Sequence, residues 1–242
     1  PTIMRPLPGN NDDLESAIMN ENNNEDDIDA ASVNDRRDNV DGSYELDDLD
    51  NVDNKNYEDR IQDALRQLNE NRDEYLSYEG LEKYSPKFLN IIENINNEKH
   101  RGCHLIYSHF RKLEGIGILK LALETNGYAQ FKIKNVDGTW KLDMNPEDEG
   151  KPTFALYTGT ETPEEKEIIR NVFNGNWTFL PAQLANELNK RSSDNLYGNI
   201  IKLLMITAAG AEGISLKNVR YVHITEPYWH PVRIQQVIGR AR

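Results

Sequence analysis

The sequence has little cysteine, no long apolar run and fewer basic than acidic residues. A single cysteine among 242 residues excludes an internal disulfide bond and favours a reducing compartment inside a cell. No apolar stretch approaches the roughly 18–20 residues that cross a bilayer, and no signal peptide is visible, so we expect no membrane partner. The net charge of −13, taken over the whole chain, argues against a nucleic-acid partner.

The acidic residues are concentrated at the start of the chain. Residues 1–56 hold 16 acidic and 4 basic residues, whereas the remainder holds 25 and 24. The remainder is therefore nearly neutral and can still carry a local basic strip. Residues 1–56 are rich in Asn, Asp and Glu and offer few side chains for a core, which predicts a disordered acidic linker or insertion. An acidic docking segment is the alternative.

Apolar periodicity begins near Tyr57 and alternates between helical and strand patterns. Strand patterns alternating with helical ones, with strands that are apolar almost throughout, predict an α/β fold with a parallel sheet and helices on both faces. The turn signal Asp137-Gly138 predicts a hairpin or insertion over residues 128–150. The expected helices span residues 57–71, 86–97, 113–127, 163–173, 180–190 and 231–242, and the expected strands span 103–110, 153–159, 201–207 and 220–225. Three local signals mark helix ends: Ser85-Pro86 as an N-cap and first-turn pair, Thr162 and Glu165 with the spacing of a capping box, and Gly127 as a left-handed C-cap.

Three segments follow from these patterns. We expect an acidic disordered segment over residues 1–56, a helical connector over 57–79 and one α/β domain over 80–242. The last predicted helix runs to the final residue, and the chain does not begin with Met. We therefore expect a fragment of a longer protein whose domain is truncated at its C-terminus.

Hydroxyl-bearing and small residues follow several predicted strands. Ser108 follows the first strand, Thr158-Gly159 the second, and Thr207 the third, which leads into a loop with Gly210 and Gly213. Ligands of open parallel sheets bind beyond the C-terminal strand ends. Hydroxyls and exposed backbone N–H groups at that edge suit the phosphates of a nucleotide or of a nucleic-acid backbone.

The final predicted helix carries Arg233, Gln236, Arg240 and Arg242. The planar guanidinium group stays charged and donates two parallel hydrogen bonds to phosphate. We expect this helix and the hydroxyl-bearing strand ends to converge on the same side of the sheet, over a cleft.

These segments resemble the motifs of superfamily 2 helicases in the form used by SNF2-like translocases. "TAAGAEGISL" is similar to motif V, and "EPYWHPVRIQQVIGRAR" is similar to motif VI. "HLIYSHF" lies where motif IV belongs, and "YTGTETPEEKEIIRNVF" is similar to the segment after it. The resemblance covers about residues 80–242 and is greatest to helicases and early-transcription ATPases of large DNA viruses. It implies the C-terminal RecA-like lobe of such an enzyme.

The resemblance also implies a role for individual residues. Nucleic-acid backbone contacts would fall on strand-end residues, and nucleotide contacts on motifs V and VI. The implied nucleic-acid-binding residues are Ser108, Thr158, Gly159 and Thr207; the implied ATP-binding residues are Gly210, Gly213, Ser215, Gln236 and Arg240, of which Gln236 and Arg240 are also catalytic.

Some parts of the family pattern are absent from the sequence. No G-x-x-x-x-G-K-[ST] loop is present, so ATP and Mg²⁺ would be held mainly by an N-terminal RecA-like lobe upstream, and this segment alone would be inactive. Lys166 stands where the family usually has Arg, and His230 where it has Asn. The second arginine of motif VI would fall one place beyond Arg242. No metal-ligand spacing is present among the histidines.

The resemblance implies partners as well as a site. DNA is favoured over RNA, with the transcription machinery as a further expected partner and the virion or the infected-cell cytoplasm as the expected location. Two alternatives stay open: a catalytically silent RecA-like binding module, and a different α/β enzyme that binds a mononucleotide at its own glycine loop.

Overall fold

The computed structural model divides into two compact units, which we describe separately. The described residues are 47–111, 115–208, 214–226 and 231–241. One unit, within residues 5–70, contains helix α2 (Asp47–Glu70). The other, within residues 71–242, contains every described strand.

Helix α2 confirms the helix expected near residues 57–71 but begins earlier, at Asp47. Its first ten residues, 47–56, are mostly Asp and Asn. The helix therefore extends into a stretch that is too polar to show an apolar pattern. The disorder expected for the rest of the acidic segment concerns residues 1–46, which lie outside the described residues.

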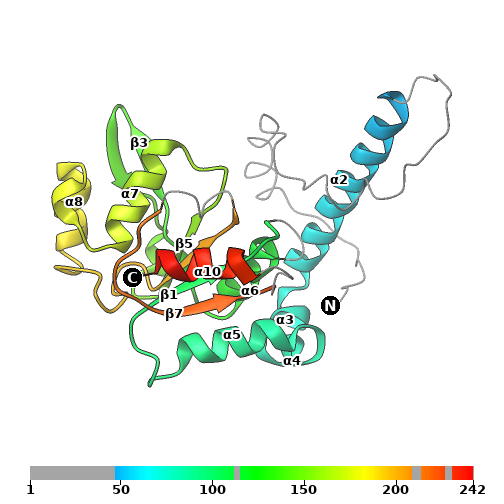
Figure 1. Cartoon of the computed structure of the whole chain (residues 1–242), viewed down its shortest axis with the longest axis horizontal. Coiled ribbons are helices and arrows are strands. Elements are labelled where there is room, and N and C mark those ends of the chain that lie inside the picture. Colours follow the sequence, from blue (N-terminus) through cyan, green and yellow to red (C-terminus); the bar gives the residue numbers. More distant parts are fainter. Residues whose placement is uncertain (1–46, 112–114, 209–213, 227–230, 242) are drawn as a thin grey trace. The chain divides into compact units, whose positions relative to one another are not determined.

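The larger unit is built on a five-stranded parallel sheet, which confirms the predicted fold class (Figure 1). The strand order is β2-β5-β6-β1-β7. Tyr107 pairs with Ile206 and Ile224, and Ile206 also pairs with Tyr157, so four strands end in register. The strands are β1 (Cys103–Tyr107), β2 (Ala129–Gln130), β5 (Thr153–Tyr157), β6 (Leu203–Ile206) and β7 (Val219–Ile224).

Helices connect these strands and cover the sheet. A capping box at Thr162 starts α7 as predicted, because Thr162 Oγ1 accepts from the N–H of Glu165 while the Glu165 carboxylate accepts from the N–H of Thr162. The helices of this unit are α3 (Arg72–Tyr75), α4 (Tyr78–Tyr84), α5 (Pro86–Asn96), α6 (Ile116–Thr125), α7 (Pro163–Phe173), α8 (Ala182–Asn189) and α10 (Pro231–Arg240), with short 3₁₀ turns η4 (Pro146–Asp148) and η5 (Trp177–Phe179).

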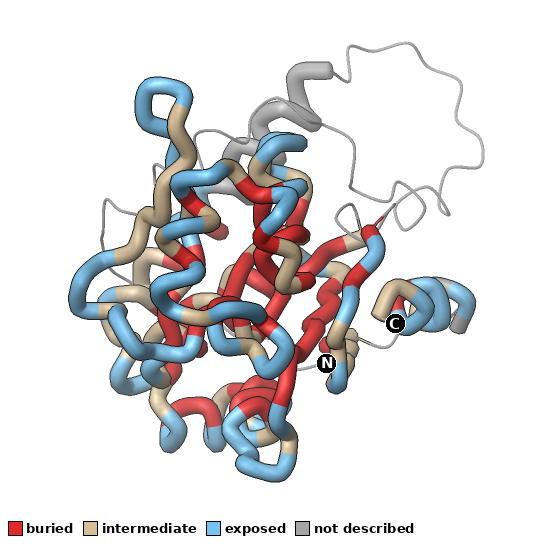
Figure 2. The backbone as a smooth tube through the Cα atoms, turned by 90° about the vertical axis from the view of Figure 1, so that its left-hand side faces the viewer, coloured by how far each residue is buried: buried red, intermediate tan, exposed pale blue. Residues whose placement is uncertain are grey.

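The helices lie on both faces of the sheet because its crossovers run in opposite directions. The β1–α6–β2 connection crosses the sheet one way and β5–α7–α8–β6 the other, and right-handed crossovers then place their helices on opposite faces. Cys103, Leu105 and Tyr107 of β1 join the core cluster that includes residues of α7, α8 and α10. The alternate residues His104 and Ile106 are also buried and face the other side. Figure 2 shows this buried sheet inside more exposed helices.

The segment between α6 and β5 confirms the predicted hairpin. Strands β3 (Ile133–Val136) and β4 (Thr139–Leu142) are antiparallel. Their two-residue turn has Asp137 at φ 52° and Gly138 at φ 77°, the backbone region that Asp and Gly tolerate best. The sequence did not predict β2, which is too short to produce an apolar pattern and is recognised only by its pairing with β5.

One predicted helix cap is confirmed in its position but not in its side-chain contact. Ser85 stands at the N-cap position of α5, and Pro86 opens the helix as expected, but the Ser85 side chain makes no capping hydrogen bond. The same residue ends α4, because its N–H donates to the carbonyl of Leu81. Its backbone conformation therefore serves the joint between two helices rather than a side-chain cap.

Candidate functional site

Four neighbouring strands are each followed directly by a hydroxyl residue. Thr158 follows β5, Thr207 follows β6, Ser108 follows β1 and Thr225 follows β7. The residues before them are paired in register, so the four form one line along the C-terminal edge of the sheet, which we call the hydroxyl row. All four residues are buried. Sequence reasoning identified three of them as candidate contacts and missed Thr225.

The hydroxyl groups of the row differ in what they bind. Thr225 Oγ1 and the Thr225 N–H both donate to the carbonyl of Tyr107, at 2.9 and 3.0 Å, so this hydroxyl extends the sheet. Thr207, in the centre, makes no side-chain hydrogen bond to the part of the chain that the structure describes. Thr207 is therefore the hydroxyl most open to a ligand.

At the end of β5, the chain's own carboxylate lies against the row. The N–H of Thr158 donates to Glu161 Oε2 at 2.7 Å, and Thr158 Oγ1 lies 3.1 Å from Glu161 Oε1. Gly159 is half-buried within this turn. Thr158 and Glu161 have the same spacing as the capping box of Thr162 and Glu165, a signal that sequence reasoning could have used.

A second carboxylate lies at the end of β1. Ser108 Oγ is 2.9 Å from Glu226 Oε2 and 2.9 Å from the carbonyl oxygen of Phe110, and the N–H of His109 donates to the same Glu226 oxygen at 3.0 Å. Lys87 Nζ lies 3.5 Å from the other Glu226 oxygen. Glu226 directly follows the last predicted strand, but no local sequence pattern predicts its contacts, because they form only when β7 pairs with β1.

Gly115 lies close to Ser108. A Cβ atom at Gly115 would lie 1.9 Å from the carbonyl oxygen of Phe110 and 2.3 Å from Ser108 Oγ. Only glycine fits at that distance, so Gly115 can lie against the Ser108 hydroxyl and the Phe110 carbonyl.

Two of the candidate nucleotide residues, Gln236 and Arg240, lie on helix α10. Val237 is buried and anchors the helix in the core. Gln236 is exposed and Arg240 is half-exposed. No heavy atom of the described residues lies within 4 Å of a Cβ built on Gly239. Arg240 makes no ion pair within the part of the chain that the structure describes, so its guanidinium group is available to a ligand.

Ser215 lies beside the end of α10. The N–H of Leu216 donates to the carbonyl of Arg240 at 3.1 Å, and Leu216 forms a single parallel bridge with Ala241. The neighbouring Ser215 is exposed. Two residues that the resemblance assigns to the nucleotide are therefore brought together although they lie far apart in sequence.

Asn174 holds this segment in place and was missed by sequence reasoning. Its Nδ2 donates to the carbonyl of Ser215 at 3.0 Å, and its Oδ1 accepts from the N–H of Lys217 at 2.7 Å. Asn174 is buried at the C-terminus of α7. Followed by Gly175, it reads in the sequence only as a helix end, so its contacts could not be predicted.

The expectation that the hydroxyl row and the arginine helix meet on one side is wrong. Helix α10 follows β7 and runs back along it, so that its C-terminal end lies near the start of β7 (Figure 1). Leu216, which bonds Arg240, precedes the first residue of β7, Val219. The reason is geometric: a helix after a strand returns antiparallel, and ten residues rise about 15 Å, most of a strand's length. The two candidate sites are at opposite ends of the strands.

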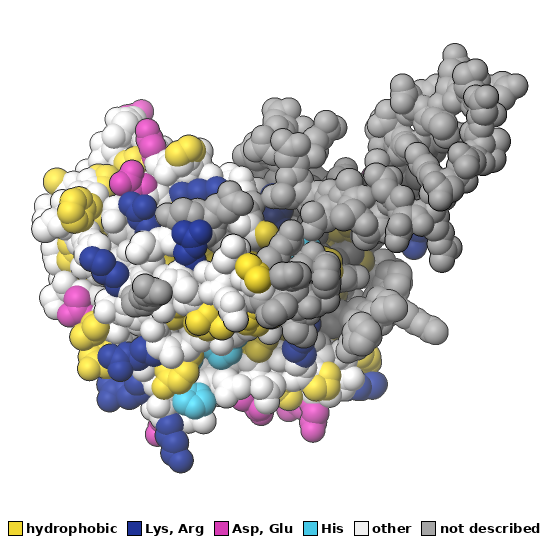
Figure 3. Space-filling model, in the orientation of Figure 1, with side chains coloured by type: hydrophobic (Ala, Val, Ile, Leu, Met, Phe, Trp, Pro, Cys, Tyr) yellow, Lys and Arg dark blue, Asp and Glu magenta, His cyan; other side chains and the backbone are white. Residues whose placement is uncertain are grey.

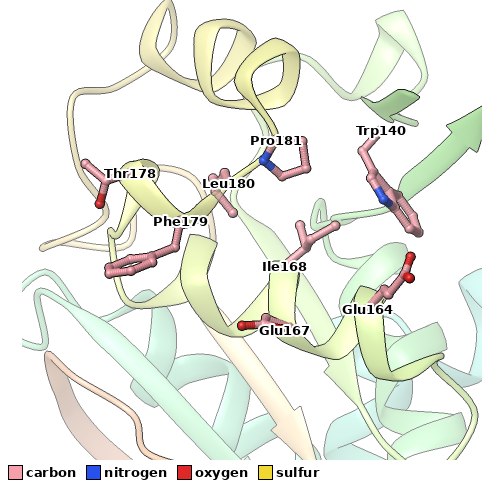
Figure 4. A pocket seen from close by; sticks show the side chains of 8 residues that line it. All are labelled: Trp140, Glu164, Glu167, Ile168, Thr178, Phe179, Leu180 and Pro181. Carbon is pink, nitrogen blue, oxygen red and sulfur yellow. The ribbon is translucent and has the colours of Figure 1, made fainter. Parts of the chain in front are cut away.

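Other features do not add to these two sites. Among the described residues, no group of three or more metal-ligating side chains could hold an ion, and no helix is long and apolar enough to cross a membrane. Gly210 and Gly213 lie outside the described residues. A hollow of about 360 Å³ between β4, α7 and η5 contains none of the predicted site residues (Figure 4). It is lined by Trp140, Glu164, Glu167, Ile168, Thr178, Phe179, Leu180 and Pro181.

The surface charge is mixed on the face seen in Figure 3. Lys and Arg side chains are scattered over the face seen in Figure 3 rather than gathered in one field. Binding of a polyanion would therefore depend on individual well-placed donors more than on a strong basic surface.

Known proteins similar to this chain are helicases and nucleoside triphosphatases of large DNA viruses. Residues 86–242 match the family described as the helicase conserved C-terminal domain. The "Putative ATP-dependent RNA helicase R563" of Acanthamoeba polyphaga mimivirus is 32% identical over 74% of this chain. The "Termination factor NPH-I homolog" of African swine fever virus is 31% identical over 66%, and the "Nucleoside triphosphatase I" of Melanoplus sanguinipes entomopoxvirus is 26% identical over 68%. The chain spans 26%, 23% and 18% of these relatives' lengths, respectively.

Proposed function

Since this chain belongs to the helicase conserved C-terminal domain family, we propose that it is the second RecA-like lobe of an ATP-dependent, SNF2-like superfamily 2 helicase or translocase. The hydrogen bond between Leu216 and Arg240 is the observation that carries the proposal. It brings Ser215, the residue before Leu216, next to Arg240, which supports a nucleotide contact shared by motifs V and VI.

The residues present fit an ATP molecule bound from one side. Gln236 and Arg240 would meet its phosphates, and Ser215 would lie near its ribose. The exposed Gln236 and the open space at Gly239 are consistent with another surface closing on α10. Mg²⁺ would be held mainly by the other lobe, and hydrolysis of bound ATP would supply the energy for opening and closing the two lobes.

Three members of the hydroxyl row, all except Thr225, would contact the phosphate backbone of a nucleic-acid strand. Ser108, Thr158 and Thr207 offer hydroxyl groups, and the N–H groups of Thr158 and His109 lie beside them. Contacts of this kind position a strand without reading its sequence. DNA remains favoured over RNA as the prediction to test, although the mimivirus relative is named as an RNA helicase. A role in viral transcription, within infected cells, is the wider proposal.

The two sites, at opposite ends of the strands, would be coupled through one segment. Thr207 belongs to the hydroxyl row, and Leu216, nine positions later in the sequence, bonds the end of α10. Closure around ATP would shift α10 and, through Leu216, the segment that begins at Thr207. A strand held at the row would then be moved relative to the other lobe.

Substitution of Arg240 in the full-length parent tests this proposal. Arg240→Ala is expected to lower kcat for ATP hydrolysis by about 10²- to 10³-fold, the usual loss of one charge-stabilising donor, while ATP binding is largely retained. Arg170→Ala is the matched control, because Arg170 lies on α7 and faces Glu167. Undiminished hydrolysis by Arg240→Ala would reject the assignment.

The same assay separates the two alternatives. A parent without any nucleic-acid-stimulated hydrolysis would favour a catalytically silent binding module. Hydrolysis by this chain alone would favour a single-domain nucleotide enzyme, because the proposed lobe lacks the phosphate-binding loop of its partner lobe.

A further inference from the structure

Two strand ends of the hydroxyl row already hold an anion. At β5, one carboxylate accepts from the N–H and lies within bonding distance of the hydroxyl of Thr158. At β1, another accepts from the N–H of His109 and lies 2.9 Å from Ser108 Oγ. In each case a backbone N–H and a hydroxyl group converge on a carboxylate. A phosphate oxygen of a nucleic-acid backbone would use the same pair of donors.

The two carboxylates reach the row by unrelated routes. Glu161 belongs to the turn that follows β5 and lies three residues after Thr158. Glu226 comes from the end of β7 and lies 118 positions from Ser108 in the sequence. A local turn cap accounts for Glu161 but not for Glu226. The common feature of the two contacts is therefore the anion site itself.

We propose that Glu161 and Glu226 are internal anions that occupy two phosphate sites of the hydroxyl row, and that a nucleic-acid strand binds by displacing them. The proposal rests on the proposed function, since it concerns the same strand-binding edge. It adds a regulatory element: the negative charge of these two side chains opposes the strand, so a strand binds only when its phosphates replace both carboxylates.

The spacing of the row suits a nucleic-acid strand that lies across the ends of the β-strands. Strand β6 separates β5 from β1, so the two anion sites are about 10 Å apart, twice the usual distance between neighbouring strands. Thr207 follows β6 and lies between them, with no side-chain hydrogen bond to the described residues. One nucleic-acid strand can therefore place a phosphate at each of the two outer sites and contact Thr207 between them.

After displacement, the two carboxylates still lie near the bound phosphates. Glu226 keeps Lys87 as a counter-charge, with Lys87 Nζ 3.5 Å from its Oε1. For Glu161, no described cation lies within ion-pair distance. The repulsion between Glu161 and a phosphate is therefore less compensated, and its removal should have the larger effect.

Binding of a labelled single-stranded oligo(dT) to the 242-residue chain tests the proposal by fluorescence anisotropy at low salt. Glu161→Gln keeps a side-chain oxygen for the N–H of Thr158 and removes the charge. It is expected to tighten binding about two- to fivefold, the range for exposed charge contacts, and Glu226→Gln to tighten it less. Glu165→Gln is the matched control, because Glu165 makes the same contacts with Thr162 away from the row. It should change binding little.

Unchanged or weaker binding by both Glu161→Gln and Glu226→Gln, with unfolding temperatures near that of the original chain, would overturn the proposal. If Glu161→Gln lowers the unfolding temperature, Glu226→Gln alone decides. An equal gain from Glu165→Gln would also overturn it, because the effect would then be one of net charge.

Threonine variants separate failure of this inference from failure of the proposed function. Thr207→Ala should weaken oligonucleotide binding, whereas Thr225→Ala should not, because that hydroxyl bonds within the sheet. If Thr207→Ala binds like the original chain, or if the chain binds no oligonucleotide, the proposed strand contact fails. If Thr207→Ala weakens binding and the glutamine variants do not strengthen it, only the internal-anion inference fails.

Discussion

The N–H of Leu216 donates a hydrogen bond to the carbonyl of Arg240, at 3.1 Å, and so joins the segment after β6 to the last turn of the final helix. Leu216 is buried, and Val237, one turn before Arg240, belongs to the same core cluster. The contact therefore anchors the base of α10 and leaves the Gln236, Gly239 and Arg240 surface open.

Gly239→Ala should separate stability from function. The site has room for a methyl group, so alanine is expected to stabilise α10 by up to about 1 kcal/mol through its higher helix propensity. Urea unfolding of the chain measures the stability. In the full-length parent the same variant should reduce ATP hydrolysis, since the methyl group would lie on the surface of α10 on which the other lobe is proposed to close.

Gly127→Ala is the matched control for that substitution. Gly127 also has no heavy atom within 4 Å, but its φ is +87°, so alanine there should destabilise the chain by about 1 kcal/mol. A loss of stability at Gly239 as large as that at Gly127 would contradict the open geometry of α10.

Asn174→Ala should destabilise the segment around Ser215. The variant leaves the carbonyl of Ser215 and the N–H of Lys217 without their partners, which we expect to cost about 2 kcal/mol. Chemical denaturation measures the change. Asn94→Ala is the control, because the Asn94 amide bonds Asn90 on an exposed helix face and should contribute little. Equal effects from both variants would show that Asn174 has no special role.

Cys103 should report unfolding through its reactivity. The thiol is buried in the core and donates to the carbonyl of Asn195 at 3.2 Å, and burial raises its pKa to about 11. At pH 8 the native protein should therefore resist a thiol reagent, and labelling should follow the fraction unfolded in urea. Complete labelling within seconds in the absence of urea would contradict the buried position.

His104 should make the protein less stable in mild acid. Burial lowers the pKa of His104 from 6.5 to about 4, and the neighbouring His223 and Lys202 charges act in the same direction, whereas the carbonyl of His100 opposes the shift. Burial also lowers the pKa of His223, whose Nε2 lies 3.0 Å from His104 Nδ1. As the pH falls, the unfolded chain therefore binds a proton at His104 before the folded protein does. Stability is complete above about pH 6.5 and falls by about 3 kcal/mol as the pH drops toward 4.

Comparison of the original chain with His104→Gln isolates this contribution. Glutamine can still donate to the carbonyl of His100 and accept from His223, but it does not titrate. The free energy of unfolding from urea titrations at pH 7.5 and 4.5 should therefore differ less for the variant. If the free energy of unfolding depended on pH in the same way in both proteins, His104 would not lower the stability in acid and the prediction would fail.

Prediction from sequence worked where a signal is local. The capping box at Thr162, the Asp137-Gly138 turn and the left-handed Gly127 were all confirmed, because each depends on a few adjacent residues. The apolar strands were also found, with ends extended by one to three residues. The two-residue strand β2 was not predicted, because it is defined only by its pairing with β5.

The sequence by itself determined the alternation of strands and helices and the hydroxyl residue after each central strand, since both follow from residue types along a short stretch. Only the tertiary structure decided which hydroxyl group bonds within the sheet and which carboxylates lie on the row. It also decided that Arg240 lies at the opposite end of the strands from Thr207. These outcomes depend on contacts such as Ser108 with Glu226, 118 positions apart, and on the antiparallel return of α10. Such contacts are set by the pairing order of strands, which no local pattern records.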